Sequence, residues 1–505
     1  MFRPVATAFI GLTALLFAPA AGIAAPATSQ AAASCAGAAP AKAMMDCLLD
    51  RAEELLKAPA TLANDKQSAD VLWVLVARIA EEAGEPDRLR GAVDHIGDAG
   101  AKRIAQGRLG AVLARKGDTA GADAVLKALL AQAPPEGQTV DVAPAHVLAA
   151  LNDTARIRAY LDGLPAPRRA DGLLAMIAEL EKADHFDRAQ SLLDDYAGKV
   201  DASAVPIVVH LPAALAFVGK GQLEAALRMA SLLPQADRLR VQSRVALARD
   251  KDGRSAEAVA AVRKMMANSP RSTDPQLAAA VLAARHGNFD DAQAKFPLTM
   301  SYDPVLLDEF WRLFAAAGQA DMAANMIDTM NSGKDRVAGY AKLALDVAGK
   351  DPAKAAELLT KARAVVDLVL DQPHGAAQQL MSFGPALVDM VRAYLALGQV
   401  TDARALVDRL ESRFAADPYG LLRSRATETL TATNQAVFAH LLKRGKADAV
   451  RAAIDGKRWR GTAARNAFAE AGRFAEAARV AEQPGRPPVA KLGDFLSVAQ
   501  YIAEK

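Results

Sequence analysis

Residues that could carry out catalysis or hold a metal ion are scattered along this chain. It contains seven histidines: His95, His146, His185, His210, His286, His374 and His440. No two of them have the i, i+4 spacing that places two imidazoles on one face of a helix for metal binding. The sequence also has no glycine-rich phosphate loop with its lysine and no Gly-x-Ser-x-Gly turn around a nucleophilic serine. We therefore predict structural or solvent-exposed histidines, no catalytic, cofactor-binding or metal-binding residues, and a protein that is not an enzyme.

The only two cysteines, Cys35 and Cys47, lie close together near the N-terminus. In an oxidising compartment they would pair, and closing the loop between them would stabilise the fold by roughly 2 to 3 kcal/mol. We predict this disulfide, which would attach an alanine-rich segment to a helix over residues 43–57. Two alternatives stay open: two unpaired thiols, or a lipid-modified Cys35.

Two tryptophans could take part in recognition. Trp311 lies in the apolar segment 310–314, where helical spacing predicts core packing. Trp459 lies in the basic segment 457–460, between two predicted helices, and this combination of charge and aromatic ring suits an anionic polymer or partner. The alternative for Trp459 is a solvated connector.

Charge is balanced along the chain, with 61 lysines and arginines against 58 aspartates and glutamates. The two signs are interspersed, which predicts solvated helix faces and not the one-sided basic surface of a nucleic-acid-binding protein. We expect no nucleic-acid partner.

The N-terminal residues 1–24 have the anatomy of a secretory signal peptide. Arg3 is their only charged residue, an apolar run extends from Val5 to Phe17, and small residues follow up to Ala24. We expect cleavage after Ala24 and a periplasmic location, with full secretion as the alternative. Residues 25–42 are rich in alanine and proline and predict a flexible leader. No later segment predicts a membrane span.

A turn signal recurs along the rest of the chain. It is a glycine or aspartate followed five residues later by alanine, and clear copies begin at Gly117, Asp184, Gly221, Gly253, Gly287, Gly318, Gly398 and Gly472. With weaker copies such as Gly84, Asn152 and Lys350, successive turns are 31 to 37 residues apart up to residue 350. Helical spacing of apolar residues on both sides of each turn predicts pairs of antiparallel helices, and such hairpins must stack to bury their apolar faces. We predict an all-α fold, an α-solenoid of stacked helical hairpins.

The unit from Leu109 to Pro134 resembles the tetratricopeptide repeat. Its matching residues are Leu109, Gly110, Leu113, Gly117, Ala122, Leu126, Leu129 and Pro134, whereas other copies keep mainly the turn. The resemblance implies a right-handed superhelix whose concave face is lined by the first helix of each hairpin.

Carrying the family's register from copy to copy implies a charged concave groove with apolar walls. Its charged residues would be Arg240, Arg285, Asp308, Arg312, Arg392 and Lys443, and Val281 would be among the wall residues. Such a groove suits an extended peptide whose carboxylates bind the arginines. The alternative is that each is an ordinary charge on a solvated helix face.

The spacing of the turns changes after residue 350, which predicts a soft boundary. We expect a regular solenoid over residues 43–350 and a part with longer helices and a C-terminal capping helix over residues 351–505. An exposed loop at residues 372–375 would lie near this boundary.

Together these features predict a periplasmic scaffold or adaptor of a bacterial cell envelope that binds a protein or peptide without a cofactor. One alternative is a protein associated with peptidoglycan remodelling, similar to the superhelical domain of lytic transglycosylases, although no non-repeat stretch is long enough for their catalytic domain. Another is a structural component of a secretion or polysaccharide-export machine.

Overall fold

The computed structural model describes residues 35–38, 40–58, 66–132, 141–196, 210–297, 303–371, 382–415, 423–454, 458–483 and 488–504. The predicted signal peptide, most of the predicted leader and the loop at 372–375 lie outside these residues. Every element within them is a helix, so the predicted all-α fold class is confirmed. None of these helices is both long enough and apolar enough to cross a membrane.

The chain divides into two compact units. Residues 70–313 form one unit, and residues 1–69 and 314–505 together form the other, so the divisions fall inside α2 (Lys66–Glu82) and α16 (Pro304–Ala316).

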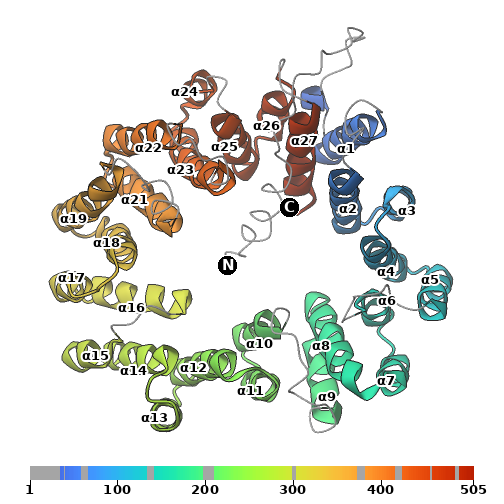
Figure 1. Ribbon diagram of the computed structural model, residues 1–505, viewed down its shortest axis with the longest axis horizontal. Coiled ribbons are helices and arrows are strands. Elements are labelled where there is room, and N and C mark those ends of the chain that lie inside the picture. The colour runs from blue at the N-terminus through green and yellow to red at the C-terminus, as the bar shows by residue number, and fades with distance from the viewer. Residues whose placement is uncertain are drawn as a thin grey trace. The chain divides into compact units, whose positions relative to one another are not determined.

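The unit of residues 70–313 is a series of short helices (Figure 1). Between α2 and α16 they are α3 (Pro86–His95), α4 (Ala99–Arg115), α5 (Thr119–Ala131), α6 (Ala143–Leu151), α7 (Thr154–Gly163), α8 (Ala166–Lys182), α9 (Phe186–Tyr196), α10 (His210–Gly219), α11 (Leu223–Ser231), α12 (Gln235–Lys251), α13 (Ser255–Asn268), α14 (Thr273–Arg285) and α15 (Phe289–Lys295). Each of α4, α8, α10, α12 and α14 packs against the helix that follows it. The first helices also pack on one another, α4 on α6, α6 on α8, α8 on α10, α10 on α12 and α12 on α14. This is the stacking of helical hairpins that the sequence predicts.

The predicted turn residues adopt the left-handed backbone conformation that a tight helix-to-helix turn requires. Gly287 has a φ of 75°, and the N–H of the next residue, Asn288, donates to the carbonyl of Ala283 at 2.9 Å. Glycine adopts this conformation without steric cost because it has no Cβ. Asn152 and Asp184 take the same place in their turns with φ values of 60° and 62°.

The other unit contains the N-terminal and C-terminal helices of the described chain. Its elements, besides parts of α2 and α16, are the 3₁₀ helix η1 (Cys35–Gly37), α1 (Ala41–Lys57), α17 (Ala320–Asp328), α18 (Gly333–Val347), α19 (Pro352–Leu370), α21 (Gly384–Ala396), α22 (Val400–Ala415), α23 (Arg423–Lys443), α24 (Ala447–Ala452), α25 (Arg458–Glu470), α26 (Phe474–Ala481) and α27 (Pro488–Ala503). The boundary that the turn spacing predicts near residue 350 stays a prediction.

Residues 35–37 belong to a packed element and not to a loose leader. Cys35 is fully buried, η1 packs against α26, and α1 packs against α27. Cys35 and Cys47 form a disulfide, which joins η1 to α1. The main-chain N–H of Cys35 also donates to Glu482 Oε1 at 2.7 Å. Within the predicted leader of residues 25–42, residues 35–37 are thus attached by covalent and hydrogen bonds to the helices beside them, and for residues 25–34 the flexible leader stays a prediction.

The buried residues of α16 include aromatic side chains that pack against one another. Trp311 is 1% exposed, and its ring centroid lies 5.0 Å from that of Phe310 and 5.3 Å from that of Phe296. Core packing of Trp311, as the helical spacing predicts, is confirmed.

Candidate functional site

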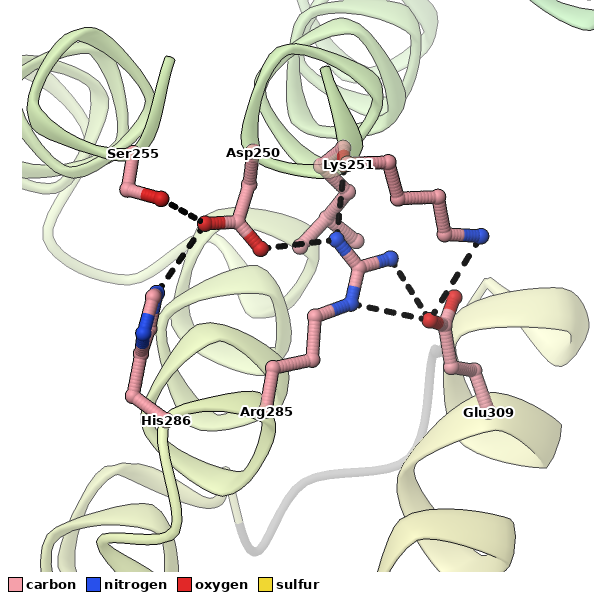
Figure 2. A network of polar contacts seen from close by, with 7 residues as sticks. Asp250, Lys251, Ser255, Arg285, His286 and Glu309 are labelled. Atoms are coloured by element: carbon pink, nitrogen blue, oxygen red, sulfur yellow. Dashed lines mark hydrogen bonds and ion pairs between the residues drawn. The ribbon is translucent and has the colours of Figure 1, made fainter. Parts of the chain in front are cut away.

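Ion pairs connect the first helices of three consecutive hairpins, α12, α14 and α16 (Figure 2). Arg285, the last residue of α14, lies between the other two. Its Nη1 donates to Asp250 Oδ2 at 3.0 Å and to the carbonyl of Leu247 at 2.7 Å, both on α12. Its Nη2 donates to Glu309 Oε1 on α16 at 2.6 Å. With a side chain only 10% exposed, Arg285 binds its neighbouring helices and does not project toward solvent.

The other carboxylate oxygen of Asp250, Oδ1, also has polar partners. Ser255 Oγ donates to Asp250 Oδ1 at 2.7 Å, and His286 Nε2 lies 3.0 Å from the same oxygen. Burial alone would raise the pKa of Asp250, but these hydrogen bonds and the charge of Arg285 outweigh it and lower the pKa. The carboxylate is thus held in its charged form inside the stack of hairpins.

A second network lies further toward the N-terminal end of α12. Arg244 Nε donates to Asp303 Oδ2 at 2.6 Å, and the main-chain N–H of the buried Asp303 donates to Asp274 Oδ1 at 3.0 Å. Arg240 Nε donates to the other oxygen of Asp274 at 3.3 Å. The two buried carboxylates, those of Asp274 and Asp303, are therefore each paired with an arginine of α12.

The six predicted partner-binding residues differ in their surroundings. Four of them, Arg240, Arg285, Asp308 and Arg312, belong to the unit of residues 70–313, and Arg392 and Lys443 belong to the other unit. Arg240 and Arg285 are partly buried in the two networks above, and Asp308 is half-buried. Their role in partner binding stays a prediction.

The remaining candidates are exposed. Arg312 lies one turn beyond Asp308 and Glu309 on α16 and makes no ion pair with the residues that the structure describes. Arg392 is exposed and pairs within its own helix with Asp389 at 3.4 Å, and Lys443 is exposed at the end of α23. In contrast, Val281 is fully buried, so its assignment to a groove wall is wrong. It packs in the core because α14 is covered on nearly all sides.

Trp459 belongs to α25 and is bound inside its own unit, so the alternative of a solvated connector is wrong, whereas contact with an anionic partner stays a prediction. Its Nε1 donates to Glu411 Oε1 at 2.8 Å, and Arg460 donates to both oxygens of the same carboxylate at 2.9 and 2.8 Å. Asn434 Nδ2 donates to Glu411 at 3.0 Å, and Glu411 is 2% exposed. The carboxylate on α22 thus neutralises a cation that the sequence places 49 residues later.

Three histidines make structural contacts. His146 Nδ1 lies 2.7 Å from Glu179 Oε2 between α6 and α8, and the ring of His95 stacks on Trp73 with centroids 4.4 Å apart. The third is His286, beside Asp250. His374 and the side chain of His210 lie outside the part of the chain that the structure describes. Within that part, no group of three or more histidine, cysteine, aspartate or glutamate residues is placed to hold a metal ion.

Sequence reasoning identified Arg285 but missed the carboxylates that bind it, Asp250 and Glu309. A signal for Asp250 was present, because it precedes the turn glycine Gly253 by three residues, near the end of the first helix of the hairpin before that of Arg285. Comparing the ends of consecutive first helices would have placed these opposite charges beside each other.

No family model matches the chain, and no curated protein matches its sequence. Among solved structures, it is similar to the maize pentatricopeptide repeat protein PPR10, with 16% identity over 88% of this chain and 86% of that one and a TM-score of 0.21. It is similar to Naa15/Naa10 bound to HypK-THB, with 15% identity over 90% and 73% of the two chains and a TM-score of 0.25. For the P58(IPK) TPR domain the identity is 14% over 78% and 99%, with a TM-score of 0.17.

These identities and TM-scores are too low to transfer a function. The hairpins, their left-handed turns and the stacking of their first helices are properties of this structure itself. The described residues form an all-helical repeat protein whose hairpins resemble the tetratricopeptide repeat.

Proposed function

We propose that this chain is an exported protein-interaction scaffold of the bacterial periplasm, which binds a partner protein along the first helices of its hairpins. The observation that carries the proposal is the pairing of Arg285 with both Asp250 and Glu309, which connects α12, α14 and α16 in a fixed order. Helices connected in this way form a rigid support, and binding surfaces on rigid elements lose less conformational entropy when a partner binds.

Exposed charges lie beside this buried network and supply the contact groups. Lys251 is 65% exposed and its Nζ is 3.7 Å from Glu309 Oε1, and Arg312 lies one helical turn from Glu309. The buried pairs fix the register of the helices, whereas these two cations remain accessible. Acidic side chains of an extended segment would complement them.

Export is supported by the signal-peptide anatomy of residues 1–24 and by the pairing of the only two cysteines, which oxidising compartments favour. Osmotic-shock fractionation of the native bacterium tests it. We expect the mature chain in the periplasmic fraction with an N-terminus near residue 25, and a full-length chain in the cytoplasm would contradict export.

Site-specific photo-crosslinking in the native bacterium tests partner binding. A photoreactive amino acid at position 251 or 312 should form the same discrete adduct. The matched control is position 263 on α13, an exposed arginine on the second helix of a hairpin, which should form none. Absence of adducts, or equal adducts at all three positions, would argue against this surface.

A zymogram tests the alternative that this chain cleaves peptidoglycan. A zymogram of the purified mature chain on peptidoglycan should show no clearing, and a clearing band would replace the scaffold proposal with an enzymatic one.

A further inference from the structure

Glu181 on α8 occupies the same place in its repeat as Asp250 on α12. Both helices are 17 residues long. The left-handed residue of the turn that follows is Asp184 in one case and Gly253 in the other, with φ values of 62° and 81°. Glu181 precedes its turn residue by three positions, and so does Asp250. Each carboxylate therefore lies at the end of a first helix that packs against the first helix of the next hairpin.

The first helices that follow these two carboxylates, α10 and α14, end in different residues. Gly221 and Gly287 are the left-handed residues after α10 and α14, with φ values of 76° and 75°. Two residues before them, α14 ends with Arg285, whereas α10 ends with Gly219. The guanidinium that pairs with the carboxylate of α12 therefore has no counterpart beside the carboxylate of α8.

The other two donors of the α12 site are missing as well. The counterpart of Ser255 is Phe186, which has no hydroxyl group. The counterpart of His286 is Lys220, whose Nζ is 2.7 Å from Asp184 Oδ1 and 4.9 Å from the centroid of the Phe186 ring. Lys220 therefore pairs with Asp184 and not with Glu181.

Glu181 therefore lacks the three donors that bind the carboxylate of Asp250. Its Oε1 is buried and has no hydrogen-bond partner among the residues that the structure describes. Burial raises the pKa of Glu181 to about 8, whereas the pKa of Asp250 is lowered at the equivalent place. Burial therefore keeps Glu181 mostly protonated at neutral pH, and a cation bound beside it would offset the cost of ionising it.

No side chain of α10 occupies the place that corresponds to Arg285, because Gly219 stands there. A Cβ built on Gly219 meets no atom within 4 Å, so the place from which an arginine side chain would start is open. In the equivalent site, Arg285 spans the distance between a carboxylate and the main-chain carbonyl of Leu247. A planar guanidinium with several N–H donors suits two such acceptors better than an ammonium does.

We propose that Glu181 binds an arginine side chain of the partner protein, which takes the position beside it that Arg285 takes beside Asp250. This site rests on the proposed scaffold function and names one chemical group that the partner must carry. It lies between α8 and α10, and two hairpins, α12–α13 and α14–α15, separate it from Arg312 on α16, one of the two positions that the crosslinking experiment tests.

The first test supplies the missing side chain from within the protein. Gly219→Arg should raise the melting temperature by about 2 °C or more relative to a matched control. Gly163→Arg is that control, because Gly163 is also the last residue of a ten-residue helix and its Cβ would also meet no atom within 4 Å. In a Glu181→Gln background the difference between the two arginine variants should disappear. A difference that persists without the carboxylate would overturn the proposal.

The second test uses a small probe, N-acetylarginine methylamide, with the mature protein. Carboxyl NMR of protein with labelled glutamate, assigned through Glu181→Gln, should show the Glu181 titration moving to lower pH as the probe is added. The equivalent lysine derivative should move it less, and Gly219→Arg should block the effect of both. An unchanged titration would reject the site, whereas crosslinking at residue 312 would still decide the scaffold function independently.

Discussion

The main-chain N–H of Cys35 donates a hydrogen bond to the carboxylate of Glu482 across 447 residues of sequence. The disulfide joins Cys35 to Cys47 on α1, and α1 packs against α27. The cross-link therefore holds an N-terminal element in place beside the C-terminal helices of the same unit. Its loss should loosen both ends of the described chain together.

Cys47→Ser should lower the free energy of unfolding by roughly 3 kcal/mol, because the unfolded chain regains the entropy of an open loop. Urea unfolding of the variant and of the oxidised wild type measures this difference. Hydrogen exchange should become faster in α26 and α27 as well as in α1.

Reduction supplies the control for this substitution. The wild type with reductant should unfold like Cys47→Ser, and reductant should leave the variant unchanged. If oxidised wild type and variant unfold at the same urea concentration, the disulfide does not stabilise the contact between α1 and α27.

The fold class was predictable because its determinants are local. Turn residues such as Gly287 and Asp184 have left-handed backbones, and the helices on both sides show their apolar period within a few turns. The packing of α1 against α27 joins elements from opposite ends of the chain, and no local pattern in either helix indicates its partner. Pairing of this kind depends on the whole stack of hairpins.

The candidate site was predictable only in part. The family register placed Arg285 on a first helix, but burial depends on which residues face it from neighbouring hairpins. Asp250 lies 35 residues before it and Glu309 lies 24 residues after it, so neither belongs to its own local pattern. Trp459 was misjudged for the same reason, because its acceptor, Glu411, lies 48 residues away.

Arg285→Gln should lower the free energy of unfolding by about 3 kcal/mol, because it leaves the buried carboxylate of Asp250 without its cation. Arg312→Gln is the matched control, since Arg312 is exposed, and should change stability by less than about 0.5 kcal/mol. Urea unfolding of the two variants checks the contrast. Equal effects would show that Arg285 does not stabilise the stack.

Glu411→Gln should destabilise the protein by about 2 kcal/mol, because the half-buried guanidinium of Arg460 loses a charged acceptor. Asp408 also binds Arg460, at 2.9 Å, but is largely exposed, so Asp408→Asn should cost less than about 1 kcal/mol. Thermal unfolding ranks the two variants. A larger loss for Asp408→Asn would contradict the central role of Glu411.

Glu181→Gln should stabilise the protein increasingly as the pH rises. The pKa of Glu181 in the folded state is about 8, above its ordinary value of 4.5, so between these values the folded protein keeps a proton that the unfolded chain releases. Wild-type stability therefore falls as the pH rises through this range and is constant above it. Glutamine carries no titrating proton, so the advantage of the variant should be absent below pH 4.5 and greatest above pH 8. Urea unfolding from pH 4 to pH 9 measures it.

Glu179, two residues away on α8, supplies a control of opposite sign. Burial alone would raise the pKa of Glu179, but the hydrogen bond and charge of His146, together with Lys182, outweigh it and hold the pKa at about 2. The folded state then releases a proton that the unfolded chain still holds, so Glu179 stabilises the protein above pH 4.5 and loses this effect as the pH falls toward 2. Glu179→Gln should therefore be less stable than wild type at neutral pH, with a difference that shrinks in acid. If both glutamine variants changed with pH in the same direction, the contrast between a carboxylate with partners and one without would be wrong, and with it the reason for an arginine at Glu181.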